Sequence, residues 1–507
     1  MNTLKKTLAL VSTLAMAATV FAGCGKDEDK DSSSSNNTAA TTAANNEEGG
    51  NAEETTAAEE GGNDTDTTSN ATKSEEVGAI DASVATGGDT FTVAAWNADD
   101  VPALIAQWKG TDYEQMKTDL ADNKVDGIEL INFQVGGGDA SAKYDELFNS
   151  GKDLDVYFCE ADWALKYIND DSKTLALDKL GFTDANFADI YSYTDEIGKD
   201  SNGVRKGVSW QAAAGGFAYR ADLAEEYLGV TSPEEMQAQI GDWDKFVAAA
   251  QTIADKSGGK TALADTLGGM WQAFACGRTQ AWVDENDVLQ IDDSCKKFAD
   301  TAKTLWDMGG VTKNEQWASD GSWQAAGVDG SCMGYFVSTW GFGGFFLDAN
   351  GGVGGETYGK WAVCQGPTPY YWGGTWIVVN PATDNGQEAQ DFIKSATVSN
   401  DQMKTYSTTK PEFVNNKTVM DELIGSGTVF NKDITGEFKD GQNFYAELAK
   451  NVESINFNGL ITPYDAAIKS QFINAVKENY LTGASWEDTV SAFEDNVVAN
   501  VPGVSIG

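Results

Sequence analysis

Aromatic residues stand repeatedly beside side chains that form hydrogen bonds. The chain has 15 Trp, and pairs such as Trp96-Asn97 and Trp210-Gln211 occur at the ends of strand-like runs. A ring face packs on apolar C–H groups, whereas carboxylates, amides and guanidinium groups form directional hydrogen bonds. A pyranose presents both kinds of surface, a C–H face and a belt of hydroxyls. The pattern therefore indicates a site for a small polar solute, most readily a sugar.

The candidate ligand contacts share two properties: an aromatic ring or a hydrogen-bonding group, and a place at a strand end or in a loop, where ligand sites of α/β proteins form. They are Trp96, Asn97, Glu160, Asp162, Trp163, Trp210, Gln211, Trp271, Trp323, Trp340, Tyr371, Trp372 and Tyr464. Each ring has core packing as its alternative role, and Glu160 and Asp162 have helix capping as theirs. Trp243, Trp306 and Trp486 lie in helical patterns and are assigned to packing.

The residue types argue against an enzyme. The chain has no histidine, which excludes a Ser-His-Asp triad and His-ligated zinc. A glycoside hydrolase with two carboxylates across a groove is the enzymatic alternative. However, Glu160 and Asp162 are too close in sequence to flank a bond from opposite sides. The acidic run 284–287 lacks the glycine and final glutamate of a calcium loop. We expect no catalytic residue, no metal and no cofactor.

Charge excludes one class of partner. The formal net charge is −43, so the phosphates of nucleic acid would be repelled. The acids are scattered, which is typical of a soluble, self-repelling surface.

The N-terminus resembles a bacterial lipoprotein export signal. Lys5 and Lys6 precede an uncharged run, 7–20, that is short for a membrane span of about 20 residues. The run leads into Phe21-Ala22-Gly23-Cys24, which resembles a lipobox. We predict a signal peptide over 1–23, an acylated Cys24 and a disordered acidic tether over 24–89. The protein would then be lipid-anchored on the extracytoplasmic face of the cell membrane.

The remaining cysteines show no metal or redox motif. They are Cys159, Cys276, Cys295, Cys332 and Cys364, and no two form a C-x-x-C pair. Cys159 and Cys364 lie in strand-like runs and are predicted to be small buried hydrophobes. Disulfide pairing stays open.

Apolar runs and helical segments alternate along the folded part. Strands are predicted at 90–96, 127–133 and 155–159, with helical segments between them. This alternation is typical of βαβ units in a parallel, doubly wound sheet. Helices are predicted from Ser232-Pro233 through 308, and further strands at 203–219, 331–337, 360–365 and 373–380. The segment 387–501 is predicted to be largely helical.

Five local patterns in this order resemble family 1 solute-binding proteins of ABC importers, the group that includes maltodextrin-binding proteins. They are Phe-Thr-Val-Ala-Ala-Trp-Asn at 91–97, the run 154–163 ending in Glu-Ala-Asp-Trp, the run 207–220, Met-Gly-Tyr-Phe-Val-Ser-Thr-Trp at 333–340, and Tyr-Trp-Gly-Gly-Thr-Trp-Ile-Val-Val at 371–379. The resemblance covers the chain from Phe91 onward.

The resemblance implies an α/β fold with two lobes, each a mostly parallel sheet flanked by helices. Hinge crossings are expected near Trp210, Val337 and Trp376. Lobe 1 would comprise 90–209 and 333–374, and lobe 2 would comprise 210–332 and 375–507. The implied function is capture of a carbohydrate by cleft closure, by a monomer that delivers it to the permease of an ABC importer. The alternative ligands on the same fold are a polyamine, a peptide or another polar solute.

Overall fold

The computed structural model describes residues 72–96, 100–135, 137–410, 412–427, 436–456 and 459–507. The chain divides into two units, Met1–Asn70 and Ala71–Gly507, and both described sheets belong to the second unit. The predicted signal peptide, Cys24 and Asn97 lie outside the described residues.

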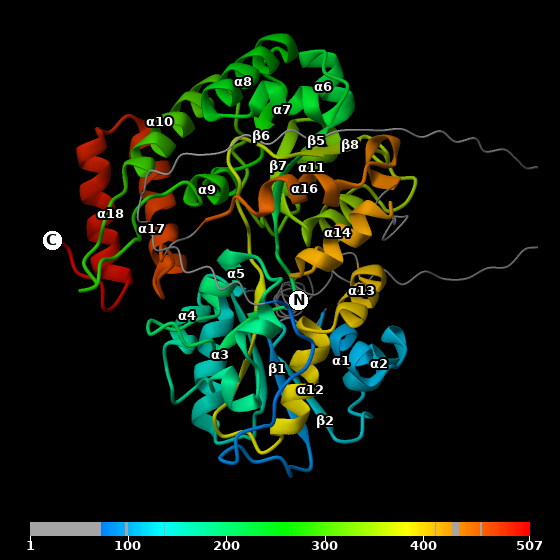
Figure 1. The fold of residues 1–507 in the computed structure, drawn as a ribbon. Helices are drawn as coiled ribbons and strands as arrows, with labels where there is room; N and C mark the ends of the chain where they lie inside the picture. Colours follow the sequence, from blue (N-terminus) through cyan, green and yellow to red (C-terminus); the bar gives the residue numbers. More distant parts are fainter. Residues whose placement is uncertain (1–71, 97–99, 136, 411, 428–435, 457–458) are drawn as a thin grey trace, which may run out of the picture. The chain divides into compact units, whose positions relative to one another are not determined.

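The first lobe is built on a five-stranded sheet in the order β2-β1-β3-β9-β4. Figure 1 shows β1 and β2 of this sheet beside α1, α2 and α12. β1 pairs in parallel with β2 and β3, whereas β9 runs antiparallel to β3 and β4. The strands are β1 (Phe91–Ala95), β2 (Ile128–Asn132), β3 (Val156–Glu160), β4 (Gly207–Ser209) and β9 (Thr375–Val379). The helices are α1 (Val101–Lys109), α2 (Tyr113–Ala121), α3 (Gly137–Ser150), α4 (Ala164–Ile168), η1 (Leu177–Leu180), η2 (Asp184–Phe187), α5 (Ser192–Ile197), α12 (Gly386–Thr397) and α13 (Asn400–Thr409).

Apolar runs decide which strands are central. All residues of β1 and β9 are buried, whereas in β2 only Ile128 is buried. A strand covered on both faces requires a continuous apolar run, and β2 at the sheet edge does not. The sequence-predicted strands at 90–96, 127–133 and 155–159 are confirmed as β1, β2 and β3.

The second lobe is built on a four-stranded sheet in the order β6-β7-β5-β8. β5 is antiparallel to β7 and β8, and β6 is parallel to β7. The strands are β5 (Gly215–Arg220), β6 (Ala262–Ala264), β7 (Cys332–Ser338) and β8 (Trp361–Cys364). The helices are α6 (Ala221–Leu228), α7 (Pro233–Ile240), α8 (Trp243–Ser257), α9 (Leu267–Ala275), α10 (Asp293–Met308), α11 (Ser322–Asp329), η3 (Phe342–Leu347), α14 (Lys417–Gly425), η4 (Lys439–Gly441), α16 (Phe444–Val452), α17 (Asp465–Glu478), η5 (Tyr480–Thr482) and α18 (Trp486–Asn500).

Capping chemistry fixes several helix starts. The Ser232 side chain accepts a hydrogen bond from Glu235 N, with Pro233 at the first helical position of α7. The Asp242 side chain accepts from Lys245 N at the start of α8. These contacts satisfy backbone donors that a helix leaves unpaired, and they confirm the predicted helix start at 232–233.

Strand membership corrects the predicted lobe boundaries. The sequence placed 333–374 with the first lobe and 375–507 with the second. Instead, β7 and β8 belong to the second sheet, and β9 belongs to the first. α12 and α13 also pack on α1 of the first lobe, and the chain returns to the second sheet with α16. An apolar run predicts a strand but does not specify its sheet, because both sheets offer buried neighbours.

Three connections join the lobes, and the segments 210–214, 370–374 and 412–416 within them pair along their backbones. The first segment lies between the other two. The hydrogen bonds are Ala212 N to Phe413 O (2.9 Å), Asn415 N to Trp210 O (2.8 Å), Gly215 N to Tyr370 O (2.8 Å) and Trp372 N to Ala213 O (3.1 Å). The predicted crossing at Val337 is wrong, because Val337 pairs with Gly216 inside the second sheet.

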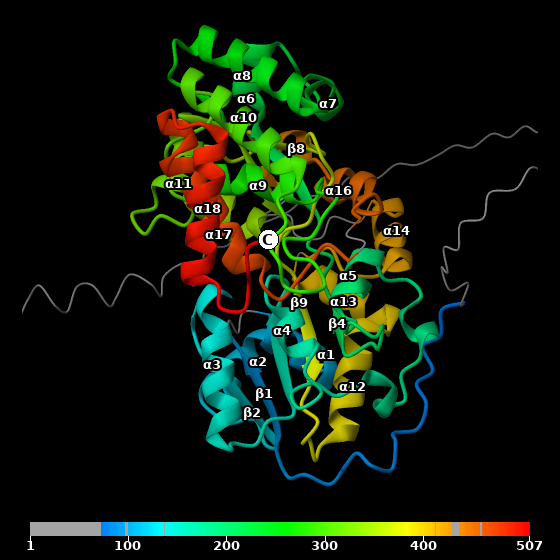
Figure 2. The same ribbon diagram turned by 90° about the vertical axis from the view of Figure 1, so that its left-hand side faces the viewer.

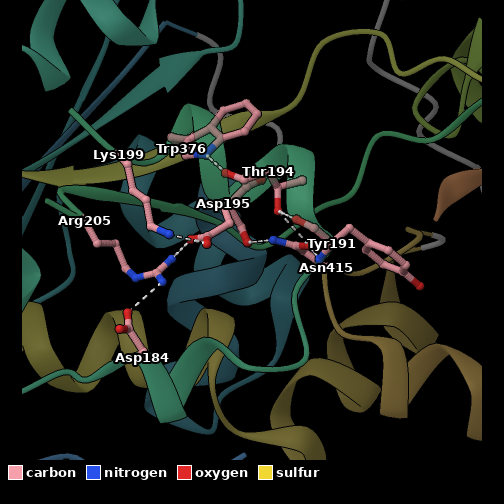
Figure 3. Close-up of polar contacts among 9 residues, drawn as sticks. Asp184, Tyr191, Thr194, Asp195, Lys199, Arg205, Trp376 and Asn415 are labelled. Atoms are coloured by element: carbon pink, nitrogen blue, oxygen red, sulfur yellow. Dashed lines mark hydrogen bonds and ion pairs between the residues drawn. The ribbon is translucent and has the colours of Figure 1, made fainter. Parts of the chain in front are cut away.

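Helix α5 holds the first-lobe ends of two crossings (Figure 3). Trp376 Nε1 donates to Thr194 O at 2.9 Å, and Thr194 Oγ1 donates to Asn415 Oδ1 at 3.1 Å. Asp195 of the same helix is ion-paired with Arg205, just before β4. These contacts fix the first-lobe ends of the crossings relative to α5.

Residues 72–89 pack along the first lobe, which corrects the C-terminal part of the predicted tether. Figure 2 shows this segment in blue. Gly78 N donates to Gly181 O at 2.8 Å, and Gln390 Nε2 donates to Gly78 O at 2.9 Å. Val77 and Val84 pack against the core. A few apolar anchors and backbone hydrogen bonds are enough to order a segment whose composition suggested disorder.

The described cysteines carry no disulfide. Cys159, Cys295, Cys332 and Cys364 are buried free thiols, and Cys276 is half-buried. The prediction that Cys159 and Cys364 are buried is confirmed. In the described part of the chain, no helix has both the length and the apolar character needed to cross a membrane.

Candidate functional site

A pocket of about 430 Å³ opens between the lobes. It is lined by Asp162 of the first lobe, by Tyr371 and Gly373 of a crossing, and by Trp271, Gln272, Ala275, Cys276, Arg278, Trp282, Asp465 and Lys469 of the second lobe.

Two tryptophans form the aromatic wall on the second lobe. Trp271, on α9, stacks on Trp282 with ring centroids 5.6 Å apart and planes 30° apart. Behind them, Phe298 and Phe472 pack edge-on or tilted against Trp271. Trp271 is 1% exposed and Trp282 is 2% exposed, so both rings belong mainly to the core and only a small part of each borders the pocket.

A guanidinium group lies beside this wall. Arg278 Nη2 pairs with Asp465 Oδ2 at 3.0 Å, and its Cζ lies 4.9 Å from the Trp282 ring centroid. Arg278 Nη1 is buried and has no hydrogen-bond partner among the described residues. A buried donor without a partner is costly, and a ligand oxygen in this pocket would satisfy it.

The first lobe contributes carboxylates from the end of β3. Asp162 Oδ2 forms an ion pair with Lys469 of α17, across the pocket. Burial opposes the charge of Lys469, but Asp162 outweighs it and the net pKa of Lys469 is raised. Glu160 Oε2 accepts a hydrogen bond from Asp162 N at 2.8 Å. Burial, reinforced by the Asp162 charge, raises the pKa of Glu160 to about 8.

The charges around the pocket balance. With Glu160 protonated near neutral pH, Asp162 and Asp465 face Lys469 and Arg278. The pocket is therefore close to electroneutral and rich in hydrogen-bonding groups. No group of three or more acidic or cysteine side chains among the described residues has metal-site geometry.

The second crossing supplies one edge of the pocket. Tyr371 stacks on Tyr193 of α5 at 5.1 Å and 26°. Gly373 adopts φ +73°, a left-handed conformation that favours glycine. A Cβ at this position would lie 3.5 Å from Trp340 Nε1 and 3.7 Å from Glu160 Oε1. Glu160 and Trp340 therefore adjoin the pocket at Gly373.

Four tryptophans form a cluster next to this edge. Trp340 Nε1 donates to Trp372 O at 2.9 Å, and the two rings are 5.0 Å apart. Trp317 stacks on Trp340 at 5.6 Å and 29°, and it also packs against Trp323 at 4.7 Å. Trp317 is 54% exposed and has φ +62°, which is unusual for a residue other than glycine. We call Trp317, Trp323, Trp340 and Trp372 the tryptophan cluster.

Several predicted residues lie away from the main pocket. Trp163 is 6% exposed and packs edge-on against Trp96 at 5.9 Å. Trp96 and Trp210 line a smaller pocket of about 260 Å³ on the first lobe, with Phe158. Trp323 is buried beneath Trp317, and its Nε1 donates to Asp265.

Two further predicted residues have other roles in the structure. Gln211 is buried in the first crossing and donates to Glu412 Oε2 at 3.0 Å. Tyr464 precedes α17 and its side chain is hydrogen-bonded to Asp287 of the acidic run 284–287. The structure thus brings Asp162, Trp271 and Tyr371 into the pocket lining and Glu160, Trp340 and Trp372 to its edge.

Sequence reasoning missed Arg278, Trp282, Asp465, Lys469 and Trp317. Asp465 and Lys469 are four residues apart on α17, so helical spacing could have placed them on one face. Arg278 and Trp317 lie in irregular segments, where no local pattern marks them.

Comparison with known proteins gives the wider context. The family model for bacterial extracellular solute-binding proteins matches residues 111–429, more than half of the chain. No curated protein sequence matches the chain.

Several solved structures share the fold. One, described as an extracellular solute-binding protein of family 1, superposes with a TM-score of 0.64 at 17% identity, covering 81% of this chain and 98% of its own. The galacto-N-biose/lacto-N-biose I-binding protein of Bifidobacterium longum gives 0.61 at 17% identity, covering 83% and 100%. An ABC-transporter-associated binding protein of Bifidobacterium animalis subsp. lactis, bound to β-1,6-galactobiose, gives 0.60 at 19% identity, covering 82% and 97%. These likenesses confirm the predicted two-lobed α/β fold. The prediction that each sheet is mostly parallel is wrong, because β9 is antiparallel to both of its neighbours and β5 is antiparallel to β7 and β8. The chain belongs to the bacterial extracellular solute-binding protein family.

Proposed function

We propose that this protein captures a neutral sugar, an oligosaccharide of two or more units, in the pocket between its lobes and delivers it to an ABC permease. The observation that carries the proposal is the pocket lining. Stacked Trp271 and Trp282 lie beside Arg278, whose Nη1 has no partner among the described residues. A sugar ring would pack its C–H face on the indoles and offer a hydroxyl oxygen to Nη1.

The balance of charge favours a neutral solute over a polyamine. A polyamine would require uncompensated carboxylates, whereas Asp162 and Asp465 are paired with Lys469 and Arg278. The tryptophan cluster continues from the pocket edge at Gly373, which supports a solute longer than one ring. The solved relatives that bind galactobiose and lacto-N-biose support the same class of ligand.

We infer that the protein is a binding component and not a glycosidase. Glu160 ends β3 and Asp162 follows it two residues later, and Asp162 N donates a hydrogen bond to Glu160 Oε2. Inverting and retaining glycosidases place their two carboxyl groups on opposite sides of the scissile bond. Oligosaccharides incubated with the protein should therefore be recovered intact, and release of shorter sugars would contradict this inference.

The proposal includes attachment to the membrane as a monomer. A signal peptide over 1–23 would direct export, and an acyl group on Cys24 would hold the domain on the extracytoplasmic face of the membrane. Metabolic labelling with a palmitate analogue should mark the wild type and not the Cys24→Ala variant. Labelling of both proteins would contradict an anchor at this position.

A thermal-shift screen tests the solute class. The arms are mono- and oligosaccharides, polyols, polyamines and peptides, followed by calorimetry on each positive compound. Because a ligand that binds only the folded state stabilises it by mass action, a neutral oligosaccharide should raise Tm. Stabilisation by spermidine or peptides, with no response to any sugar, would overturn the proposal.

A further inference from the structure

The crossings meet at one buried carboxylate, that of Glu412, which begins the third paired segment. Glu412 is 5% exposed. Its Oε2 accepts a hydrogen bond from Gln211 Nε2 of the first crossing at 3.0 Å, and its Oε1 accepts from Thr339 Oγ1 at 2.6 Å. Oε1 also accepts from Phe413 N at 3.0 Å.

We propose that Glu412 is a positioning residue of the hinge, which fixes the first crossing against the third and, through Thr339, sets the position of Trp340 beside the pocket. The chain of contacts supports this role. Thr339 immediately precedes Trp340, whose Nε1 donates to Trp372 O of the second crossing at 2.9 Å. One side chain thus connects all three crossings with the tryptophan cluster.

A carboxylate suits this place better than any other side chain. Three donors converge on it, and an ionised carboxylate is an acceptor at both oxygens. An amide would turn its own donor toward one of these groups. Hydrogen bonds to a charged acceptor are also stronger than neutral ones.

The backbone beside Glu412 shows that the crossings are held tightly. Ala213, between the two pairings of the first crossing, has φ +48°. A residue other than glycine keeps such a conformation only where its surroundings over-determine it. Here those surroundings are the neighbouring crossings, which bond to Ala212 and Ala213 on either side.

Charged and titratable groups face Glu412 from several elements. They are Asp100 at the start of α1, Tyr193 of α5, Tyr406 of α13 and Tyr445 of α16, with Lys410 at 3.5 Å from Asp100. Burial, and then the charge of Asp100, raise the pKa of Glu412 to about 7. The hinge therefore carries a charge that titrates close to neutrality.

Hydrogen–deuterium exchange of the full chain without solute tests the role, independently of which ligand is correct. In Glu412→Ala, the amides of 210–215, 370–372 and 413–415 should exchange about tenfold faster, because Gln211 Nε2, Thr339 Oγ1 and Phe413 N lose their acceptor. The double variant Gln211→Glu/Glu412→Gln reverses donor and acceptor and should keep exchange slow. Glu437→Ala is the matched control, because Glu437 is also a buried acid with a pKa raised to about 7 by burial, but lies outside the crossings.

A pH profile separates positioning from a merely structural role. In the wild type, the exchange of the crossings, corrected for the intrinsic rate of each amide, should accelerate as pH rises from about 4.5 to about 7, because the closed hinge keeps a proton on Glu412 that the solvated carboxylate of the opened hinge loses first. Glu412→Gln should show no such step, and Glu437→Gln should keep it. Unchanged crossing exchange in a folded Glu412→Ala variant, or fast crossing exchange in the double variant, would overturn the proposal.

Discussion

The two walls of the pocket differ in the side chains that they supply and in where the partners of those side chains lie. The second lobe supplies stacked rings and a guanidinium group that pair within that lobe, Trp271 with Trp282 and Arg278 with Asp465. The first lobe supplies Asp162, whose ion-pair partner Lys469 comes from the opposite lobe. The second-lobe wall is therefore complete by itself, whereas the first-lobe wall depends on closure. This difference suggests that solute docks first on the second lobe and that closure adds the carboxylates.

Removing Arg278 should have the largest effect on stability and binding, because Arg278 pairs with Asp465 in the second-lobe wall. Arg278→Met leaves the buried Asp465 unpaired, which costs about 3–5 kcal/mol of unfolding free energy. Urea unfolding measures the loss, and calorimetry should show weaker sugar binding. The double variant Arg278→Met/Asp465→Asn should recover most of the stability but not the affinity. Recovery of both would show that Arg278 does not contact the solute.

The pH dependence of stability should reveal the buried acid on the first-lobe wall. The folded-state pKa of Glu160 is raised from 4.5 to about 8, so the unfolded state loses this proton first as pH rises. Unfolding free energy should therefore fall between about pH 4.5 and pH 8, by about 2 kcal/mol after allowance for partial solvent access. Glu160→Gln should remove this part of the decline. An identical pH profile in that variant would contradict the assigned shift.

Breaking the contact between the lobes should weaken binding but should not prevent folding. In Asp162→Asn, solute affinity should fall about tenfold, as expected for one hydrogen bond to a charged group. Stability should fall by less than in Arg278→Met, because the Asp162 side chain is 38% exposed, although Lys469 is only 20% exposed. Asp145→Asn is the matched control, since Asp145 is 48% exposed and paired with Lys166 at 2.6 Å, away from the pocket. Equal affinity losses in both variants would point to net charge and not to contact.

The smallest effect concerns the exposed member of the tryptophan cluster. Trp317→Ala should weaken binding of longer oligosaccharides about threefold to tenfold, the scale of one aromatic contact, and leave disaccharide binding unchanged. Trp486→Ala, where the ring packs on Tyr480 at the start of α18, serves as the control. Calorimetry with a series of chain lengths measures the difference. A loss that is independent of length would place Trp317 outside the extended site.

The sequence predicted more of the fold than of the site. Buried strands such as β1 and β9 can be predicted from the sequence, because a continuous run of apolar residues is a local property. Sheet membership is not local, and the inserted strand β9 was therefore assigned to the wrong lobe. Trp163 and Trp323 show the same limit, since an indole at a strand end or a loop can equally turn into the core. Arg278 and Lys469 reach the pocket from segments far apart in the chain, which only the folded structure brings together.

The most direct test is a crystal structure of the protein with the neutral oligosaccharide that the thermal-shift screen identifies. We expect a sugar ring against Trp271 and Tyr371, a hydroxyl oxygen within hydrogen-bonding distance of Arg278 Nη1, and Asp162 in contact from the opposite lobe. A sugar bound elsewhere, with Arg278 Nη1 still unpartnered and the pocket between the lobes filled only by water, would contradict the account.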